Sequence, residues 1–187
     1  MTPRFTLLPT PIDGLLVVER KPLKDARGSL ERLYCSLELG GLLGDCPLAA
    51  INRTQTTQRG TVRGMHFQRA PHAELKLVSC LRGEVHDVAV DLRRDSRTFL
   101  QHHAVLLSAE NSRSLLIPQG FAHGFQTLCD GCEMLYLHTA SYHPESEDGL
   151  DAMDPRLSIA WPLPVTERST RDQSHAPLDA SFKGIVP

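Results

Sequence analysis

The chain has 187 residues, with 20 Lys and Arg against 22 Asp and Glu. This length is enough to bury a core without a disulfide or a structural metal ion. The formal net charge is −2 and no block of basic residues stands out, which argues against a nucleic-acid or membrane surface as the partner but leaves room for a small anionic ligand.

The first residues, MTPRFTLLPTPIDGLLVVER, contain no apolar run of the length expected for a signal peptide or a membrane span. Pro9 and Pro11 interrupt the apolar residues that are present. We therefore expect a cytoplasmic protein. The number of cysteines is odd, which in this setting predicts free thiols at Cys35, Cys46, Cys80, Cys129 and Cys132.

The middle of the chain reads as short strands separated by turns. Residues 76–92, KLVSCLRGEVHDVAVDL, predict a hairpin with its turn at Arg82–Gly83. Residues 102–118 contain two apolar runs around a polar turn, and residues 125–139 predict a second hairpin around Asp130–Gly131. Because no long helical period occurs here, we expect an all-β fold, a cupin-type double-stranded β-helix or jelly roll.

The segment that follows Pro162 is richer in Pro, Ser and charged residues. We expect this tail, from about residue 163, to wrap around the barrel, with short helical segments near both termini. No repeat, low-complexity tract or long linker divides the chain. Residues 1–187 are therefore predicted to form a single domain.

One motif raises the possibility of a metal site. IPQGFAHGF places Pro118, Gly120 and His123 as in the second half of the cupin signature, whereas the run MHFQRAPHAE supplies only an incomplete first half. A metal needs several converging ligands with suitable geometry. The candidates would be His66, His72, Glu74 and His123. Because their spacing is incomplete, we predict no metal and no cofactor, and keep a metal-dependent cupin enzyme as an alternative.

Several segments occur in the order, and nearly at the spacing, of one known family. They are GTVRGMHFQ, KLVSCLRGEVHDVAVDLRRDSRTF, LSAENSRSLLIPQGFAHGFQTL, Leu135–Tyr136 and DPRLSIAWP. From about Arg27 to Leu178 the chain resembles the metal-independent, cupin-fold dTDP-4-dehydrorhamnose 3,5-epimerases. The resemblance implies a cofactor-free isomerase that inverts C3, C5 or both in a nucleotide-linked 4-keto-6-deoxyhexose. A monoepimerase for another nucleotide sugar and a non-catalytic sugar-nucleotide binding module are the alternatives.

Epimerisation beside a ketone needs a base for the α-proton, a positive charge for the enolate oxygen and an acid that returns a proton to the opposite face. Histidine is suited to the first task, and the resemblance assigns that role to His66. It also matches Asp172 to the aspartate that pairs with the base, where a carboxylate fixes the tautomer and stabilises the imidazolium. A purely structural histidine is the competing interpretation, which the nearby Arg63 and Lys76 disfavour.

The resemblance assigns the remaining roles as well. Lys76 and Arg63 are the candidates that would hold the enolate, although a lysine at this place could also be an edge charge on a strand. Tyr136 is matched to the acid, with a core tyrosine as the alternative. His123 and Asp87 are expected to line the pocket.

Substrate binding is where the chain departs from the family. The family pattern RGFFxE reads RGSLER here, so Arg27 is kept for a phosphate while Ser29 replaces an aromatic residue. The family pattern Q-x-N reads A-I-N, which keeps Asn52. Gln68 closes the RGMHFQ motif and is also expected to bind substrate. These changes leave the nucleotide open. The family further implies a homodimer, in which the N-terminal strands cross to the neighbouring barrel.

Overall fold

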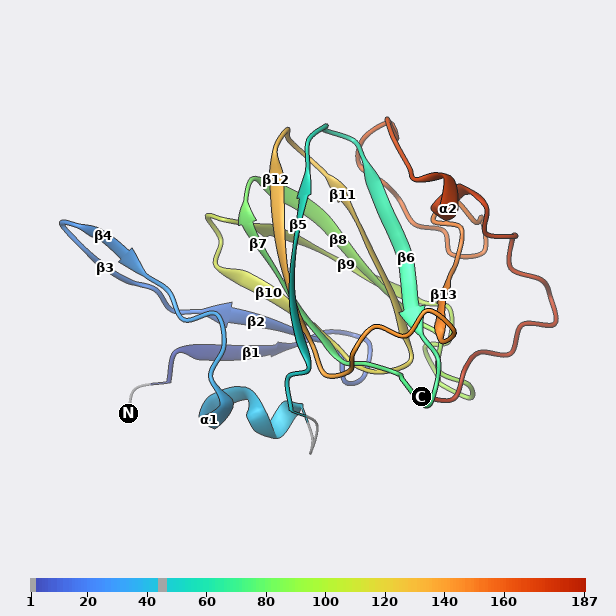
Figure 1. Ribbon diagram of the computed structural model, residues 1–187, viewed down its shortest axis with the longest axis horizontal. Helices are drawn as coiled ribbons and strands as arrows, with labels where there is room; N and C mark the ends of the chain where they lie inside the picture. Colours follow the sequence, from blue (N-terminus) through green and yellow to red (C-terminus); the bar gives the residue numbers. More distant parts are fainter. Residues whose placement is uncertain (1–2, 44–46) are drawn as a thin grey trace.

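A computed structural model describes residues 3–43 and 47–187, and within them two antiparallel sheets face each other (Figure 1). The larger sheet has six strands in the order β1 (Phe5–Pro9), β2 (Leu16–Arg20), β10 (Arg113–Ile117), β7 (Lys76–Arg82), β12 (Cys132–His138) and β5 (Ala50–Thr56). The smaller sheet has five in the order β13 (Glu147–Gly149), β6 (Val62–Gln68), β11 (Phe121–Thr127), β8 (Glu84–Asp91) and β9 (His102–Ser108). The predicted all-β jelly roll is confirmed.

Apolar side chains fill the space between the sheets because each strand turns alternate residues inward. Val78 and Leu115 of the larger sheet belong to the same buried cluster as Val85 and Phe125 of the smaller one. A second cluster covers the outer face of the smaller sheet, where strand residues such as Met65 pack with residues of the C-terminal segment. Strand β11 is consequently buried at every position.

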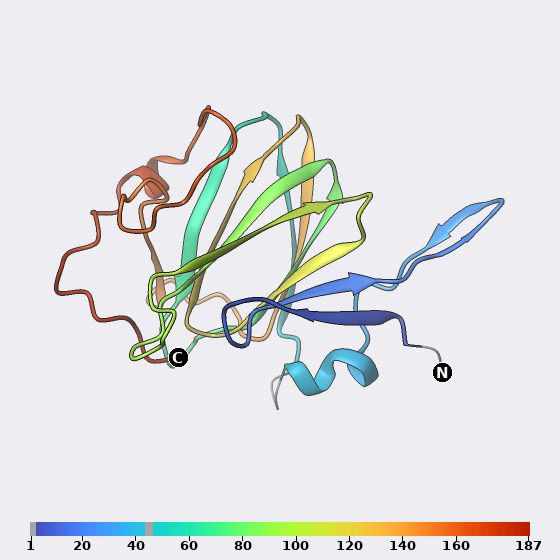
Figure 2. The same cartoon turned by 180° about the vertical axis from the view of Figure 1, so that it is seen from behind.

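The C-terminal tail packs along the outer face of the smaller sheet (Figure 2). The backbone nitrogen of Val62 donates to the carbonyl of Glu167, and that of Ile185 donates to Leu92. The predicted short helices are present as α1 (Ser36–Leu39), a 3₁₀ turn η1 (Gly40–Leu42) and α2 (Thr170–Gln173). In residues 3–43 and 47–187, no helix has the length and apolar character needed to cross a membrane.

The two predicted hairpins are wrong, although their strands are in the expected places. Strand β7 belongs to the larger sheet and β8 to the smaller one, and β11 and β12 are divided in the same way. Each turn therefore carries the chain from one sheet to the other, and β7 pairs with β12 while β8 pairs with β11. A turn-forming dipeptide such as Asp130–Gly131 reverses the chain but does not determine whether the strands meet edge to edge or face to face.

The inter-sheet turns bring cysteines together without a disulfide. Sγ of Cys129 and Sγ of Cys132 are 3.6 Å apart, and both residues are free thiols, as are Cys35 and Cys80. This agrees with the predicted free thiols, while Cys46 lies outside the described residues.

A small hairpin projects from the larger sheet. Strands β3 (Leu23–Asp25) and β4 (Gly28–Leu30) pair with each other and are exposed at every position. Both views show this hairpin extending away from the body of the molecule (Figures 1 and 2). The side chain of Arg27 at its turn is 90% exposed and pairs with Asp25 at 2.7 Å.

Candidate active site

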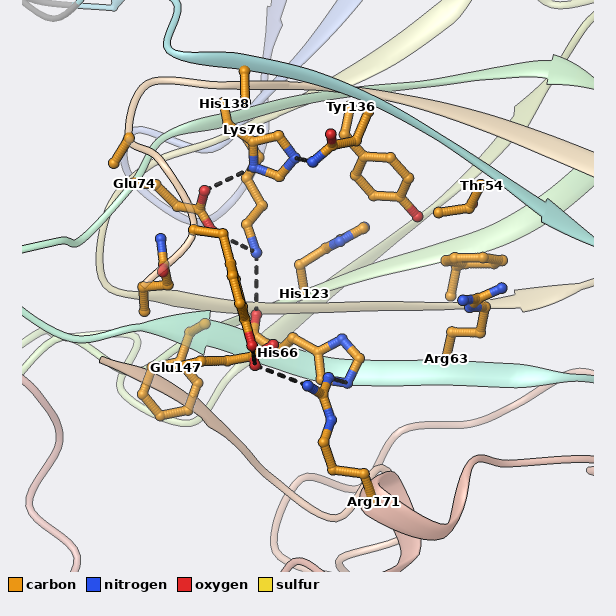
Figure 3. A pocket seen from close by; sticks show the side chains of 17 residues that line it. Thr54, Arg63, His66, Glu74, Lys76, His123, Tyr136, His138, Glu147 and Arg171 are labelled. Carbon is orange, nitrogen blue, oxygen red and sulfur yellow. Dashed lines mark hydrogen bonds and ion pairs between the residues drawn. The ribbon is translucent and has the colours of Figure 1, made fainter. Parts of the chain in front are cut away.

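A cavity of about 430 Å³ lies between the two sheets and is open at one end (Figure 3). Strands β5, β7 and β12 form one wall and β6 and β11 form the other. The predicted site residues that line it are Asn52, Arg63, His66, Gln68, Lys76, His123 and Tyr136. The motifs that the sequence analysis singled out are therefore gathered at one place from strands distant in the chain.

The predicted partner of His66 comes from the tail. Nε2 of His66 lies 2.8 Å from Oδ1 of Asp172, a residue of the short helix α2. The other carboxylate oxygen accepts from the backbone nitrogen of Gly64 at 3.2 Å. A carboxylate only accepts, so Nε2 of His66 donates to Asp172, and the guanidinium of Arg171 at 3.1 Å from the same nitrogen is a close approach of two donors rather than a hydrogen bond. Nδ1 is then the basic nitrogen, and in Figure 3 it faces the interior of the cavity.

The environment of Asp172 strongly favours its charged form. Burial raises the pKa of this carboxyl, but the hydrogen bond and charge of His66 and the amide of Gly64 outweigh burial and lower the pKa from 3.8 to about 2. The carboxylate is therefore ionised across the neutral range and available to stabilise an imidazolium at His66.

An irregularity in β6 places both Arg63 and His66 in the cavity. Two residues, Gly64 and Met65, oppose the single Gly124 of β11, which is the arrangement of a β-bulge. Gly64 has φ of +131°, and a Cβ atom there would lie 2.5 Å from Cα of Gly124, so only glycine is accommodated. Regular alternation would have turned Arg63 and His66 to opposite faces, because they are three residues apart.

On the opposite wall, Lys76 is part of a buried polar chain. Nζ of Lys76 lies 3.1 Å from Oε1 of Glu74 and donates to the carbonyl of His66 at 3.4 Å. The second oxygen of Glu74 lies 2.7 Å from Nδ1 of His138, and Nε2 of His138 lies 3.3 Å from Nδ2 of Asn52. Sequence reasoning considered Glu74 only as a metal ligand and overlooked His138. The signal was present, since both lie two residues from a predicted site residue, on the same face of the chain.

Tyr136 projects into the cavity from β12, near the buried pair of His123 and Asp87. Nε2 of His123 lies 3.0 Å from both carboxylate oxygens of Asp87, and the rings of His123 and Tyr136 meet edge to face with centroids 5.9 Å apart. Burial, reinforced by the charge of Asp87, raises the pKa of the Tyr136 phenol above its ordinary value. The phenol is therefore protonated at neutral pH and able to donate.

Three other predicted substrate ligands are placed differently. Asp87 is fully buried behind His123 and is not among the residues that line the cavity. Arg27 lies on the exposed hairpin and not at the cavity of its own chain. Gln68 lines the cavity, but its amide nitrogen donates to the carbonyls of His72 and Ser141 and its oxygen accepts from His143. Gln68 thus ties the two loops at the cavity edge together.

The four candidate metal ligands have separate partners. His66 pairs with Asp172 and His123 with Asp87, while Glu74 holds Lys76 and His138. His72 stacks on His143 with ring centroids 3.5 Å apart. These side chains do not converge on one point among the residues that the structure describes.

Three polar residues at the mouth were not predicted. The hydroxyl of Tyr142 donates to Oε2 of Glu147 at 2.7 Å, and Nη1 of Arg171 donates to the same oxygen at 2.8 Å. The guanidinium of Arg171 also comes within 3.1 Å of Nε2 of His66 (Figure 3). A second exposed cation therefore stands at the mouth in addition to Arg63.

We predict that Asp172→Asn lowers the free energy of unfolding at pH 7 by about 2 kcal/mol, the value that corresponds to the lowered pKa. Because the folded-state pKa lies below the unfolded one, this stabilisation is complete above about pH 4 and disappears as the pH falls toward 2. Urea denaturation of both proteins between pH 7 and pH 2 measures the difference. Asp148→Asn, which removes an exposed pair with Arg69, is the control and should cost less than about 1 kcal/mol throughout. A difference for Asp172→Asn that does not change with pH would contradict the prediction.

Comparisons with known proteins show the family to which the chain belongs. The family model for dTDP-4-dehydrorhamnose 3,5-epimerase matches residues 9–180. The enzyme of that name from Salmonella typhimurium is 40% identical over 177 residues, covering 94% of this chain and 97% of its own. The dTDP-6-deoxy-D-glucose-3,5-epimerase of Legionella pneumophila, solved with dTDP-4-keto-L-rhamnose, superposes with a TM-score of 0.89 at 38% identity, covering 98% of this chain and 99% of that one.

A related activity also occurs among the similar structures. A 3'-monoepimerase from Streptomyces bikiniensis, in complex with dTDP-quinovose, has a TM-score of 0.85 at 30% identity and covers 91% of this chain and 86% of its own. The resemblance seen in the sequence motifs is thus confirmed over nearly the whole chain: the protein belongs to the dTDP-4-dehydrorhamnose 3,5-epimerase family, a family of isomerases.

Proposed function

We propose that this protein epimerises a nucleotide-linked 4-keto-6-deoxyhexose at C3, C5 or both. The observation that carries the proposal is the placement of His66 and Tyr136 on facing sheets, with the ammonium of Lys76 also directed into the cavity (Figure 3). A base and an acid on opposite walls suit inversion, in which the proton leaves from one face and returns to the other. The epimerase names of the relatives support the same reaction.

In the proposed reaction, Nδ1 of His66 removes the proton from the carbon beside the ketone. The resulting imidazolium is stabilised by Asp172, which already bonds to Nε2. The ketone oxygen becomes an enolate and is held by Lys76. Tyr136 then delivers its phenolic proton to the opposite face of the sugar. Its raised pKa keeps the phenol protonated until that step.

The mouth of the cavity suits a diphosphate. Arg63 and Arg171 are exposed there, and guanidinium groups bind phosphate oxygens in a bidentate manner. The Legionella relative was solved with a dTDP-linked sugar, which supports a nucleotide sugar as the substrate class. Because a 3,5-epimerase and a 3'-monoepimerase are both among the similar structures, C3 and C5 are the two candidate positions of inversion.

The function is proposed to require a homodimer in the cytoplasm. The exposed hairpin carrying Arg27 lies away from its own cavity, which supports a role at the cavity of a partner subunit. The free thiols of Cys35, Cys80, Cys129 and Cys132 are consistent with a reducing compartment.

The proposed reaction is tested by incubation in D₂O with a panel of nucleotide-linked 4-keto-6-deoxyhexoses, with exchange at C3 and C5 followed by NMR. We expect deuterium at one or both carbons with wild-type protein and a loss of about 10²- to 10⁴-fold in His66→Asn, the cost typical of losing a general base. Unchanged exchange in His66→Asn would contradict the role of His66. Exchange that depends on stoichiometric bound zinc, iron or manganese would favour the metal-dependent alternative, and no exchange at all would favour a binding module.

Tyr136→Phe separates removal of the proton from its return. Phe keeps the volume of the ring, so we expect deuterium to enter with retention through His66 while the inverted product falls by about 10²-fold or more. Stereochemistry at the exchanging carbon, read by NMR, is the measurement. An equal loss of exchange and inversion would exclude the arrangement of base and acid on two faces. Tyr34→Phe, which removes the same hydroxyl from a tyrosine that does not line the cavity, is the matched control.

The dimer is tested by subunit complementation. The Arg27→Ala and His66→Asn variants are each expected to have low epimerase activity alone. A mixed dimer would combine the His66 of one chain with the Arg27 of the other into one intact site. Mixing the two variants should then recover about a quarter of wild-type activity, from half of the dimers with one working site each. No recovery, or a fully active monomer in sedimentation velocity at micromolar concentration, would refute the proposal.

A further inference from the structure

The carboxylate of Glu74 lies between the ammonium of Lys76 and the imidazole of His138. Its Oε1 lies 3.1 Å from Nζ of Lys76 and its Oε2 lies 2.7 Å from Nδ1 of His138. The side chains of Glu74 and Lys76 are only 8% and 11% exposed, so neither charge is solvated by water alone. A buried ion needs such partners, because leaving it unpaired costs several kcal/mol.

The side chains at the two ends of this hydrogen-bonded series, Lys76 and Asn52, determine which groups donate and which accept. The amide nitrogen of Asn52 only donates, so Nε2 of His138 accepts from it, and Nδ1 of His138 carries the proton and donates to Glu74. Burial raises the pKa of Glu74, but the hydrogen bond to His138 and the charge of Lys76 outweigh burial and lower the pKa below its ordinary value. Glu74 is therefore an anion with both oxygens occupied by donors.

The ammonium of Lys76 has three N–H donors. One meets Glu74 and one meets the carbonyl of His66 at 3.4 Å, and these are its hydrogen bonds within the described residues. The third is left for the cavity, where Lys76 points in Figure 3. The carboxylate of Glu74 and the carbonyl of His66 thus determine the direction of the remaining N–H of Lys76.

We propose that Glu74 and His138 are positioning residues that hold the Lys76 ammonium in the orientation needed to bind the enolate oxygen. This inference rests on the function proposed above and extends it to two side chains that do not themselves meet the reacting carbons. Glu74 acts on Lys76 directly, and His138 acts through Glu74 while linking it to Asn52 on the neighbouring strand β5.

The first test concerns the protein without substrate. ¹⁵N-labelled wild-type protein should show His138 as the tautomer protonated on Nδ1 in long-range ¹H–¹⁵N spectra, assigned with His138→Asn. In Glu74→Gln, the amide offers one acceptor to two donors, so His138 or Lys76 must face an NH₂ group. We expect the signals of His138 to move in this variant and to stay in Glu133→Gln, the control on the same strand as His138. A wild-type His138 protonated on Nε2 would overturn the proposal.

The second test measures turnover of the 4-keto sugar. We expect Glu74→Gln to lower kcat by about 10- to 100-fold, the cost of misplacing a catalytic group by about 1 Å, with KM changed by less than about 3-fold. His138→Asn keeps a donor near the Nδ1 position and should retain more activity than His138→Leu, which has none. Glu133→Gln should match wild type. Circular dichroism and thermal unfolding check that each variant is folded.

A third comparison identifies Lys76 as the group through which they act. In a Lys76→Met background, Glu74→Gln should cost less than about 2-fold, because the group it positions is already gone. The same loss in both backgrounds, a wild-type kcat in Glu74→Gln, or equal activity of His138→Asn and His138→Leu would overturn the inference. If the wild-type protein gave no exchange, the proposed function would fail instead, whereas the tautomer of His138 would still report on the network.

Discussion

Alternation along the strands of two facing sheets is the constraint on which the cavity depends. A side chain enters the cavity only from an inward position, and inward positions recur every second residue. Tyr136 and His138 satisfy this on β12, and His66 and Gln68 satisfy it on β6. Because β6 and β12 belong to different sheets, their side chains approach the cavity from opposite walls. The proposed separation of base and acid is therefore a consequence of the architecture rather than of any single contact.

Two departures from this regularity complete the site. The bulge at Gly64 adds Arg63 to the inward face of β6, and the tail brings Asp172 to His66. The tail is held in place by apolar packing against the outer face of the smaller sheet, through residues such as Leu157 and Ile185. The outward residues of β6 thus anchor the segment that orients its inward histidine, so folding of the tail and orientation of His66 are coupled.

The sequence allowed prediction of the strands and the local motifs, but not of strand partners or of contacts between residues distant in the chain. Alternating apolar residues located the strands, and the motif around His66 located the main wall of the cavity. The turn at Asp130–Gly131 was visible, but its passage between sheets was not, because a dipeptide carries no information on strand partners. Arg27 was expected to bind substrate, and the single chain leaves it on an exposed hairpin. The link from Glu74 to His138 joins residues 64 apart, and only the pairing of β12 with β7 brings them together.

The distribution of charge around the cavity suits a proton transfer that separates charge. In the proposed reaction His66 would take a proton from the sugar, so a new cation would form beside Asp172 and a new anion beside Lys76, each next to an existing opposite charge. Glu74 stabilises the ammonium while the cavity is empty, and its charge would compete with the enolate afterwards. Its second oxygen accepts from His138, which draws part of the negative charge away from Lys76. The hydrogen bond from His138 therefore allows one carboxylate to hold the lysine in place without cancelling the attraction that the reaction requires.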